Sequence, residues 1–191
     1  MKKTVVVLLA DGFEEIEALT PVDYLRRAGC FVVIAAVKDD ELVEGAHGIK
    51  VAADIKLADF VKNESYKDFD CIVIPGGMPG ASNIAQSEQA VNLIKAFVEK
   101  DRLIGCICAS PAVVLPKTGA LEGHKWTCYP SMEESTGPYK ANHIKDQPFV
   151  HDGNLVTGRG PGAAEEFSME LVKTLTGQES YVKVKTASLQ R

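Results

Sequence analysis

Long hydrophobic runs are absent from this 191-residue sequence. No apolar stretch approaches the roughly 20 residues of a membrane-spanning helix, so we expect no membrane partner. The first ten residues imitate the start of a signal peptide, but Asp11 and Gly12 interrupt them and no small-residue cleavage site follows. Internal repeats, low-complexity segments and long linkers are also lacking. We therefore expect one domain over residues 1–191, since domains usually span roughly 100–200 residues.

Basic residues are fewer than acidic ones, with 21 Lys and Arg against 26 Asp and Glu and a net charge of -5. Nucleic acids and anionic membranes attract basic surfaces, so nucleic acid is not expected as the main partner. The five cysteines are an odd number in a chain too large to need disulfides. This count argues against a secreted disulfide framework and favours reduced thiols in the cytoplasm.

Motifs for metals and phosphates are missing as well. Neither GxxxxGK[ST] nor GxGxxG occurs. Cys106 and Cys108 form a lone CxC without a second Cys or His pair, which is a weak signal for zinc. The histidines are scattered without the spacing of a metal site, and none adjoins Cys108: His47, His124, His143 and His151. We expect no metal and no cofactor.

Apolar runs without polar alternation recur along the chain, as in strands that are covered on both faces of a parallel sheet. They lie at residues 4–10, 31–37, 71–75 and 103–107. Segments with helical periodicity alternate with them, at residues 14–28, 88–100 and 161–177. The alternation predicts a doubly wound α/β sandwich, in which ligands bind beyond the carboxyl ends of the strands.

Two further stretches, residues 42–53 and 148–157, break this alternation. The second turns at Asp152-Gly153 and is predicted to be a β-hairpin. The fold class is therefore a mostly parallel sheet sandwiched by helices, with hairpin additions.

Cys108 ends the run at residues 103–107 and precedes a short predicted helix that begins near Pro111. A nucleophile elbow needs small residues two before and two after the reactive residue, and Cys106 and Ser110 meet this need. The start of a helix would favour a thiolate and any oxyanion that it forms. The alternative is that both cysteines only pack as small hydrophobic residues.

The glycine-rich stretch PGGMPG at residues 75–80 follows another predicted strand. Its backbone N–H groups could form an oxyanion hole at the same sheet edge, although a plain turn explains the glycines equally well. The acidic stretch DGFEEIE follows the first strand. Glu14 and Glu15 fit helix capping, whereas Glu17 lies among apolar residues in a helix that Pro21 interrupts.

The motifs DGFEEIE, PVDYLRRAG, IVIPGGMPG, ICASP and TGRGPG occur in this order from Lys3 to about Val184. Together they resemble the ThiJ/PfpI superfamily and, within it, the DJ-one branch. The resemblance implies a flavodoxin-like fold, a homodimer, a reactive Cys108 and a partner carboxyl at Glu17. It also implies that the backbone of Gly77 and Ala109 surrounds the sulfur or a bound oxyanion.

Three positions depart from relatives. Protease-like members place a His directly after the elbow Cys, where this chain has Ala109, so a peptidase is not expected. Tyr129 replaces a His of many close relatives; it can orient a substrate by a hydrogen bond but is a poor base near neutral pH. His47 stands where some relatives have an Arg at the dimer-side edge of the pocket, which leaves anion binding open.

The resemblance favours a cofactor-free glyoxalase or deglycase that acts on methylglyoxal-type aldehydes or glycated groups. In this hypothesis the Cys108 thiolate adds to the aldehyde and Glu17 moves the proton. The alternative is an oxidative-stress sensor or redox chaperone, switched when Cys108 is oxidised to sulfinate.

Overall fold

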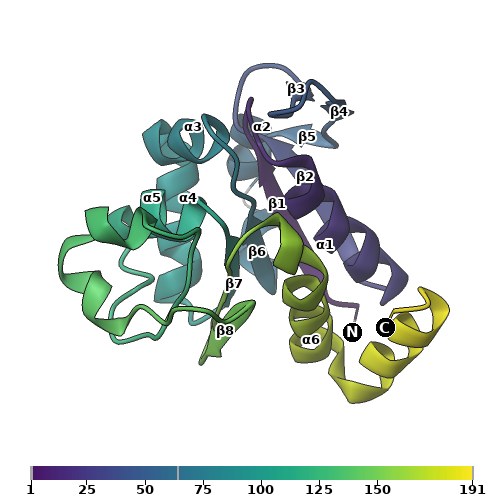
Figure 1. Cartoon of the computed structure of the whole chain (residues 1–191). Coiled ribbons are helices and arrows are strands. Elements are labelled where there is room, and N and C mark those ends of the chain that lie inside the picture. The colour runs from purple at the N-terminus through teal and green to yellow at the C-terminus, as the bar shows by residue number, and fades with distance from the viewer. Residues whose placement is uncertain (1, 64, 191) are drawn as a thin grey trace.

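The computed structural model describes residues 2–63 and 65–190 and confirms the doubly wound α/β fold (Figure 1). Its main sheet has seven strands in the order β5-β2-β1-β6-β7-β9-β8. Every described neighbour pair in this sheet is parallel except β8 with β9. The four predicted buried strands form its centre: β1 (Thr4–Leu9), β2 (Phe31–Ala36), β6 (Cys71–Ile74) and β7 (Leu103–Ile107).

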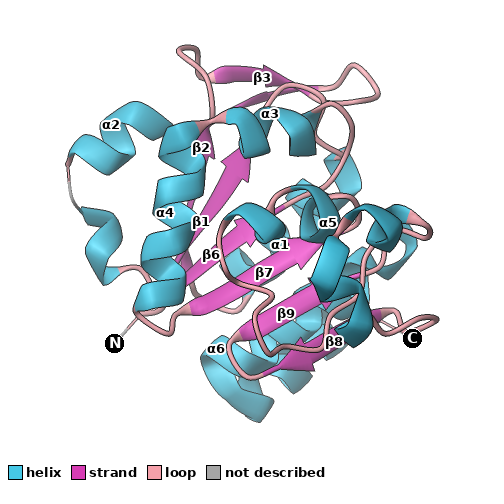
Figure 2. Cartoon of the chain, turned by 90° about the vertical axis from the view of Figure 1, so that its left-hand side faces the viewer, coloured by secondary structure: helices cyan, strands magenta, loops and turns pink. Residues whose placement is uncertain are grey.

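Helices cover both faces of the sheet, which explains why the central strands carry aliphatic side chains on both sides (Figure 2). One face carries α1 (Glu15–Arg27) and α6 (Ala164–Ala187). The other carries α2 (Leu57–Lys62), α3 (Gly80–Gln86), α4 (Glu88–Glu99) and α5 (Ser110–Val113). No helix in the described part of the chain is long and apolar enough to cross a membrane.

The two stretches that break the alternation both form antiparallel pairs. β8 (Phe149–Asp152) and β9 (Leu155–Gly158) are the predicted hairpin, and β9 joins the main sheet beside β7. β3 (Leu42–Glu44) and β4 (Lys50–Ala52) form a separate small sheet. The edge strand β5 (Ile55–Lys56) and the helices α2 and α3 were not predicted from the sequence, because elements this short show no clear periodicity.

The helix α1 matches its predicted range of residues 14–28 to within one residue at each end, whereas α6 runs further than its sequence signals suggest. Pro21 lies inside α1 without ending it, so the predicted interruption is wrong. Gly177 does leave helical geometry, with φ 84° and ψ 174°, yet the helix resumes and reaches Ala187. Gly177 is therefore a kink and not the predicted end of the helix. The part of α6 after Gly177 packs against the rest of the protein through the buried Val184.

The strand order reverses between β1 and β6, and the loops that follow these strands lie at the carboxyl edge of the sheet, where ligands bind in folds of this kind. Backbone hydrogen bonds hold these loops together: the Glu14 N–H donates to the Gly76 carbonyl over 3.0 Å. The loop after β7 joins them, since the Ser110 hydroxyl donates to the Pro75 carbonyl over 2.6 Å. The three loops that the sequence singled out therefore meet.

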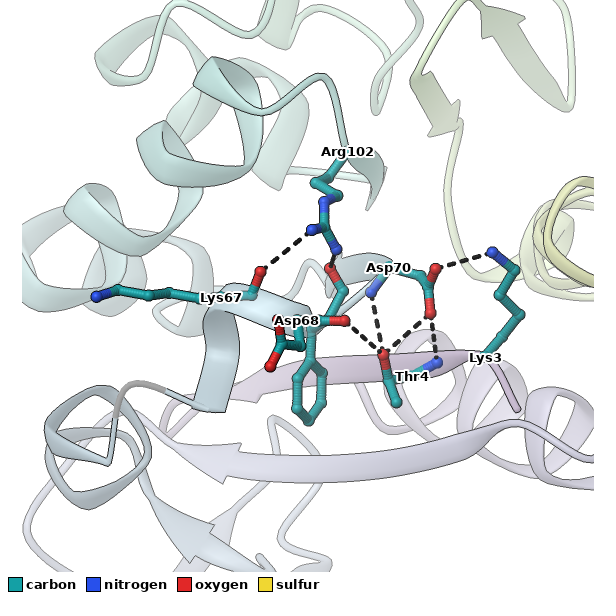
Figure 3. Close-up of polar contacts among 7 residues, drawn as sticks. Lys3, Thr4, Lys67, Asp68, Asp70 and Arg102 are labelled. Carbon is teal, nitrogen blue, oxygen red and sulfur yellow. Dashed lines mark hydrogen bonds and ion pairs between the residues drawn. The ribbon is translucent and has the colours of Figure 1, made fainter. Parts of the chain in front are cut away.

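A polar network fixes the opposite edge of the sheet, where β1 and β6 begin (Figure 3). The Asp70 carboxylate accepts hydrogen bonds from the Lys3 ammonium at 2.8 Å, the Thr4 N–H at 2.9 Å and the Thr4 hydroxyl at 3.0 Å. Arg102 donates to the carbonyl groups of Phe69 and Lys67. The network ties three neighbouring strands at their amino ends.

Asp70→Ala is expected to lower the free energy of unfolding by about 2 kcal/mol, because it leaves partly buried donors without an acceptor. Burial would raise the Asp70 pKa, but the hydrogen bonds from Lys3 and Thr4 outweigh burial and lower it. The stabilisation is thus complete above the carboxyl's ordinary pKa and is lost as pH falls through the lowered value. Urea unfolding at pH 7 and pH 3 measures both effects. Asp39→Ala is the control, since the Asp39 side chain is 97% exposed and its loss should cost less.

Candidate active site

Cys108 occupies the turn between β7 and α5 with a φ of 66°. Residues other than glycine rarely adopt this left-handed conformation, which costs of order 1–3 kcal/mol. Two backbone hydrogen bonds hold it: the Cys108 N–H donates to the Gly158 carbonyl over 2.9 Å, and the Cys108 carbonyl accepts from the Tyr129 N–H over 2.8 Å. The geometry is that of the predicted nucleophile elbow.

The Cys108 residue is 8% exposed, which makes it the most accessible of the five cysteines. Cys71 and Cys106 are fully buried in the sheet, and burial raises the pKa of the Cys106 thiol. The helix that follows Cys108 stabilises a thiolate less than the sequence suggested, because α5 has only four residues. Cys108 is therefore mostly covered by neighbouring residues, although it is less covered than the other four cysteines.

Glu17 lies in the first turn of α1 and is fully buried. Its Oε2 accepts a hydrogen bond of 2.9 Å from the Gly76 N–H. Its Oε1 is buried without a hydrogen-bond partner of standard geometry among the described residues. Burial raises the pKa of Glu17 to about 7, although the contacts with Cys108 and the Gly76 N–H partly offset it. The carboxyl can therefore hold or release a proton near neutral pH.

The carboxyl and the thiol share one electrostatic environment. Burial raises the pKa of Cys108, and the negative charge of an ionised Glu17 raises it further. The N–H groups of Gly77 and Ala109 face the sulfur and act in the opposite direction. A thiolate is thus disfavoured beside a charged carboxylate, and the pair is best described as holding one proton between two groups.

Gly76 brings the two groups together, and sequence analysis overlooked it in favour of Gly77. A Cβ at Gly76 would lie 2.6 Å from Glu17 Oε2 and 2.7 Å from the Cys108 Cβ, so only glycine fits this position. The sequence signal was the double glycine after β6, which did not indicate which of the two contacts the carboxyl. Gly77 itself needs glycine for another reason, since its φ is 87°.

Tyr129 and His47 are less closely tied to this pair. The Tyr129 backbone N–H donates to the Cys108 carbonyl, and Tyr129 is 49% exposed. The His47 ring lies 2.8 Å from the Glu15 carboxylate, and this hydrogen bond together with Glu14 raises the pKa of His47. No hydrogen bond or ion pair within the described ranges joins either side chain to Cys108 or Glu17.

Glu15 does more than the helix capping expected for it. The cap residue Glu14 makes no side-chain capping hydrogen bond, and Glu15 is buried. Its carboxylate accepts from both the backbone and the ring of His47, so it anchors the β3–β4 hairpin loop. Burial would raise the Glu15 pKa, but the His47 contacts outweigh it and lower the pKa.

Comparisons with known proteins agree with this geometry. The model of the DJ-1/PfpI family matches residues 3–174. Protein DJ-1 homolog B of Arabidopsis thaliana is 39% identical over 185 residues, which are 97% of this chain and 41% of the relative. The chain thus spans less than half the length of that relative. A protein of Caenorhabditis elegans named glutathione-independent glyoxalase DJR-1.2 is 36% identical over 93% of this chain and 91% of its own length.

Among solved structures, oxidized DJ-1 of Toxoplasma gondii superposes with a TM-score of 0.90. It is 38% identical, and the match covers 98% of both chains. The fold, the order of the motifs and the sequence identity over nearly the whole chain point to one family. The chain belongs to the DJ-1/PfpI family, within its DJ-1 branch.

Proposed function

We propose that this chain is a cofactor-independent glyoxalase that converts methylglyoxal-type 2-oxoaldehydes to 2-hydroxy acids. The observation that carries the proposal is the Cys108 elbow beside a buried Glu17 whose pKa is about 7. This pair supplies a nucleophile and a proton carrier, both in largely buried residues. The relative from Caenorhabditis elegans that is named a glutathione-independent glyoxalase supports it.

The first step joins the sulfur to the aldehyde. The Cys108 thiolate forms a bond to the aldehyde carbon, and the carbonyl electron pair moves to oxygen. The N–H groups of Gly77 and Ala109, which face the sulfur, stabilise this oxyanion. Protonated Glu17 then gives its proton to the oxygen, which produces a neutral hemithioacetal and a carboxylate.

The second step moves hydrogen within the substrate. The Glu17 carboxylate removes the proton from the former aldehyde carbon and returns it to the neighbouring ketone carbon. The hydroxyl proton of the hemithioacetal passes to the ketone oxygen in the same rearrangement. The first carbon is thereby oxidised to a thioester while the second is reduced to an alcohol, so no external oxidant is needed. Water then cleaves the thioester carbon–sulfur bond and releases lactate and Cys108. The overall change is methylglyoxal plus water to lactate.

Free aldehydes fit the site better than adducts on proteins or nucleotides. Cys108 is 8% exposed and Glu17 is fully buried, so a bulky glycated group meets the sulfur only after local opening. Deglycase activity is therefore proposed as the slower reaction. Tyr129, half exposed beside the elbow, is proposed to orient the substrate.

Lactate formation from methylglyoxal without glutathione tests this function. We expect many turnovers per chain, with no added metal or cofactor. Oxidation of Cys108 in a single stoichiometric event, without lactate turnover, would contradict it.

The second candidate function is redox sensing by Cys108. Among the described residues the Glu17 Oε1 atom has no standard hydrogen-bond partner, and protonated Glu17 would donate from this atom to a sulfinate oxygen on Cys108. The five unpaired cysteines fit the reducing cytoplasm that we propose as the location. Sensing is favoured if peroxide yields a stable sulfinate and methylglyoxal yields no product.

A homodimer is proposed around α1 and the β3–β4 loop. Ile16 and Ile49 are each 54% exposed; Ile16 follows Glu15 in α1, and the Ile49 N–H donates to the Glu15 carboxylate over 3.5 Å. Exposed aliphatic side chains that gather on one surface mark protein interfaces. Light scattering at micromolar chain concentration should give about twice 20.6 kDa. Ile16→Lys should shift the mass to that of one chain, and a monomeric wild type would refute the proposal.

A further inference from the structure

Cys128, Glu133 and His143 form a second cluster of reactive side chains, separate from Cys108 and Glu17. One ligand-type atom from each lies within 4.8 Å of the other two. All three belong to the irregular segment between α5 and β8, drawn in green in Figure 1. Their spacing in sequence gave no metal motif, because the segment must fold back before His143 meets Cys128.

The carboxyl group of Glu133 has an unsatisfied oxygen atom, and this atom points to a missing ligand. Glu133 is 4% exposed, and its Oε2 atom is buried without a hydrogen-bond partner in the described part of the chain. A buried carboxylate oxygen without a donor is costly, whereas a bound cation would satisfy it. The cluster therefore contains an acceptor whose protein partner is missing.

The spacing of the other two groups suits a tetrahedral ion. Cys128 Sγ lies 3.8 Å from His143 Nε2. Zinc bonds of about 2.3 Å to sulfur and about 2.0 Å to nitrogen place these atoms about 3.5 Å apart in tetrahedral geometry. Small side-chain movements are enough to close the site.

Trp126 holds the histidine in place. The fully buried indole packs edge-on against the His143 ring with centroids 5.0 Å apart. Backbone hydrogen bonds on both sides of His143 join its segment to Trp126: the Trp126 N–H donates to the Asn142 carbonyl, and the Ile144 N–H donates to the Trp126 carbonyl. The imidazole is thus oriented before any ion binds, which lowers the cost of binding.

We propose that Cys128, Glu133 and His143 form a zinc-binding site. Sulfur excludes Mg²⁺ and Ca²⁺, which prefer oxygen ligands, and a mixed sulfur, nitrogen and carboxylate set suits Zn²⁺. The Cys128 thiol releases its proton to solvent as the sulfur–zinc bond forms. The three side chains leave the fourth coordination position to water.

Titration with Zn²⁺ alone against a chromogenic chelator tests this site. Cys108→Ser serves as the background, so that the elbow thiol does not compete. We expect one Zn²⁺ per chain, with binding at least tenfold weaker after Cys128→Ser or Glu133→Gln. Co²⁺ should give a thiolate-to-cobalt absorption band that disappears with Cys128→Ser.

His47→Gln is the matched control, because Glu14, Glu15 and His47 form the rival cluster and should contribute nothing. Should Cys128→Ser fail to fold, Glu133→Gln and His143→Gln decide the question through the same affinity and cobalt spectrum. Zinc binding that persists in these variants, or that depends on His47, would overturn the proposal, as would no zinc binding at all.

Discussion

Glu17→Gln is expected to reduce lactate formation about 100-fold or more while Cys108 stays open to oxidation. General acid–base catalysis by one side chain contributes typically 10²–10⁴-fold, and an amide cannot carry the proton between the two substrate carbons. Gln can still accept the Gly76 N–H and donate to the sulfur. The variant therefore separates proton transfer from sulfur activation, and steady-state lactate assays paired with peroxide labelling measure the two separately.

Glu17→Leu is the companion variant, because Leu offers the thiolate no donor. We expect the Cys108 pKa to be higher in the Leu variant than in the Gln variant, and thiolate absorbance titrations measure this difference. One unit of pKa corresponds to about 1.4 kcal/mol of differential stabilisation. Equal thiol pKa values in the wild type and both variants would show that Glu17 does not influence the sulfur.

The raised pKa of Glu17 also makes stability depend on pH. A carboxyl whose pKa rises from 4.5 to about 7 on folding binds its proton more tightly in the folded state. Its contribution is therefore largest below the unfolded pKa and is lost as pH rises through the folded value, a change of about 3 kcal/mol by pH 8. Glu17→Gln lacks this loss, so it should gain stability over the wild type between pH 5 and pH 8 in urea unfolding.

Gly76→Ala is also expected to reduce the turnover of methylglyoxal to lactate by about 100-fold. The added Cβ would lie 2.6 Å from Glu17 Oε2, 2.7 Å from Cys108 Cβ and 2.9 Å from the Ile107 carbonyl. Relief of these contacts must move the carboxyl, the elbow or the end of β7, and displacements of this size misplace reacting groups. Overpacking of this kind also costs typically 1–3 kcal/mol of stability.

Gly162→Ala is the matched control, since no heavy atom of the described residues lies within 4 Å of a Cβ added there. This variant should keep the turnover and the unfolding midpoint of the wild type. Kinetic constants and urea midpoints for both glycine variants make the comparison. Wild-type turnover in Gly76→Ala would mean that the close approach of Gly76 to Glu17 and Cys108 plays no part in the reaction.

Sequence information was richest where a pattern is local. Continuous aliphatic runs predicted β1, β2, β6 and β7, because strands covered on both faces need apolar side chains at every position. The Cys106–Ser110 spacing predicted the elbow, because a tight strand-to-helix turn needs small neighbours. Short elements such as α2, α3 and β5 were missed, since two to seven residues hold too little periodicity.

The sequence by itself determined the layered α/β architecture, the family resemblance and the choice of Cys108 and Glu17. Tertiary structure alone decided that Gly76 holds the Glu17 carboxyl, that Glu15 anchors His47 and that Cys128, Glu133 and His143 meet. The physical reason is that strand and helix patterns follow from neighbouring residues. Burial, pKa shifts and ligand clusters instead depend on which distant segments the folded chain brings into contact.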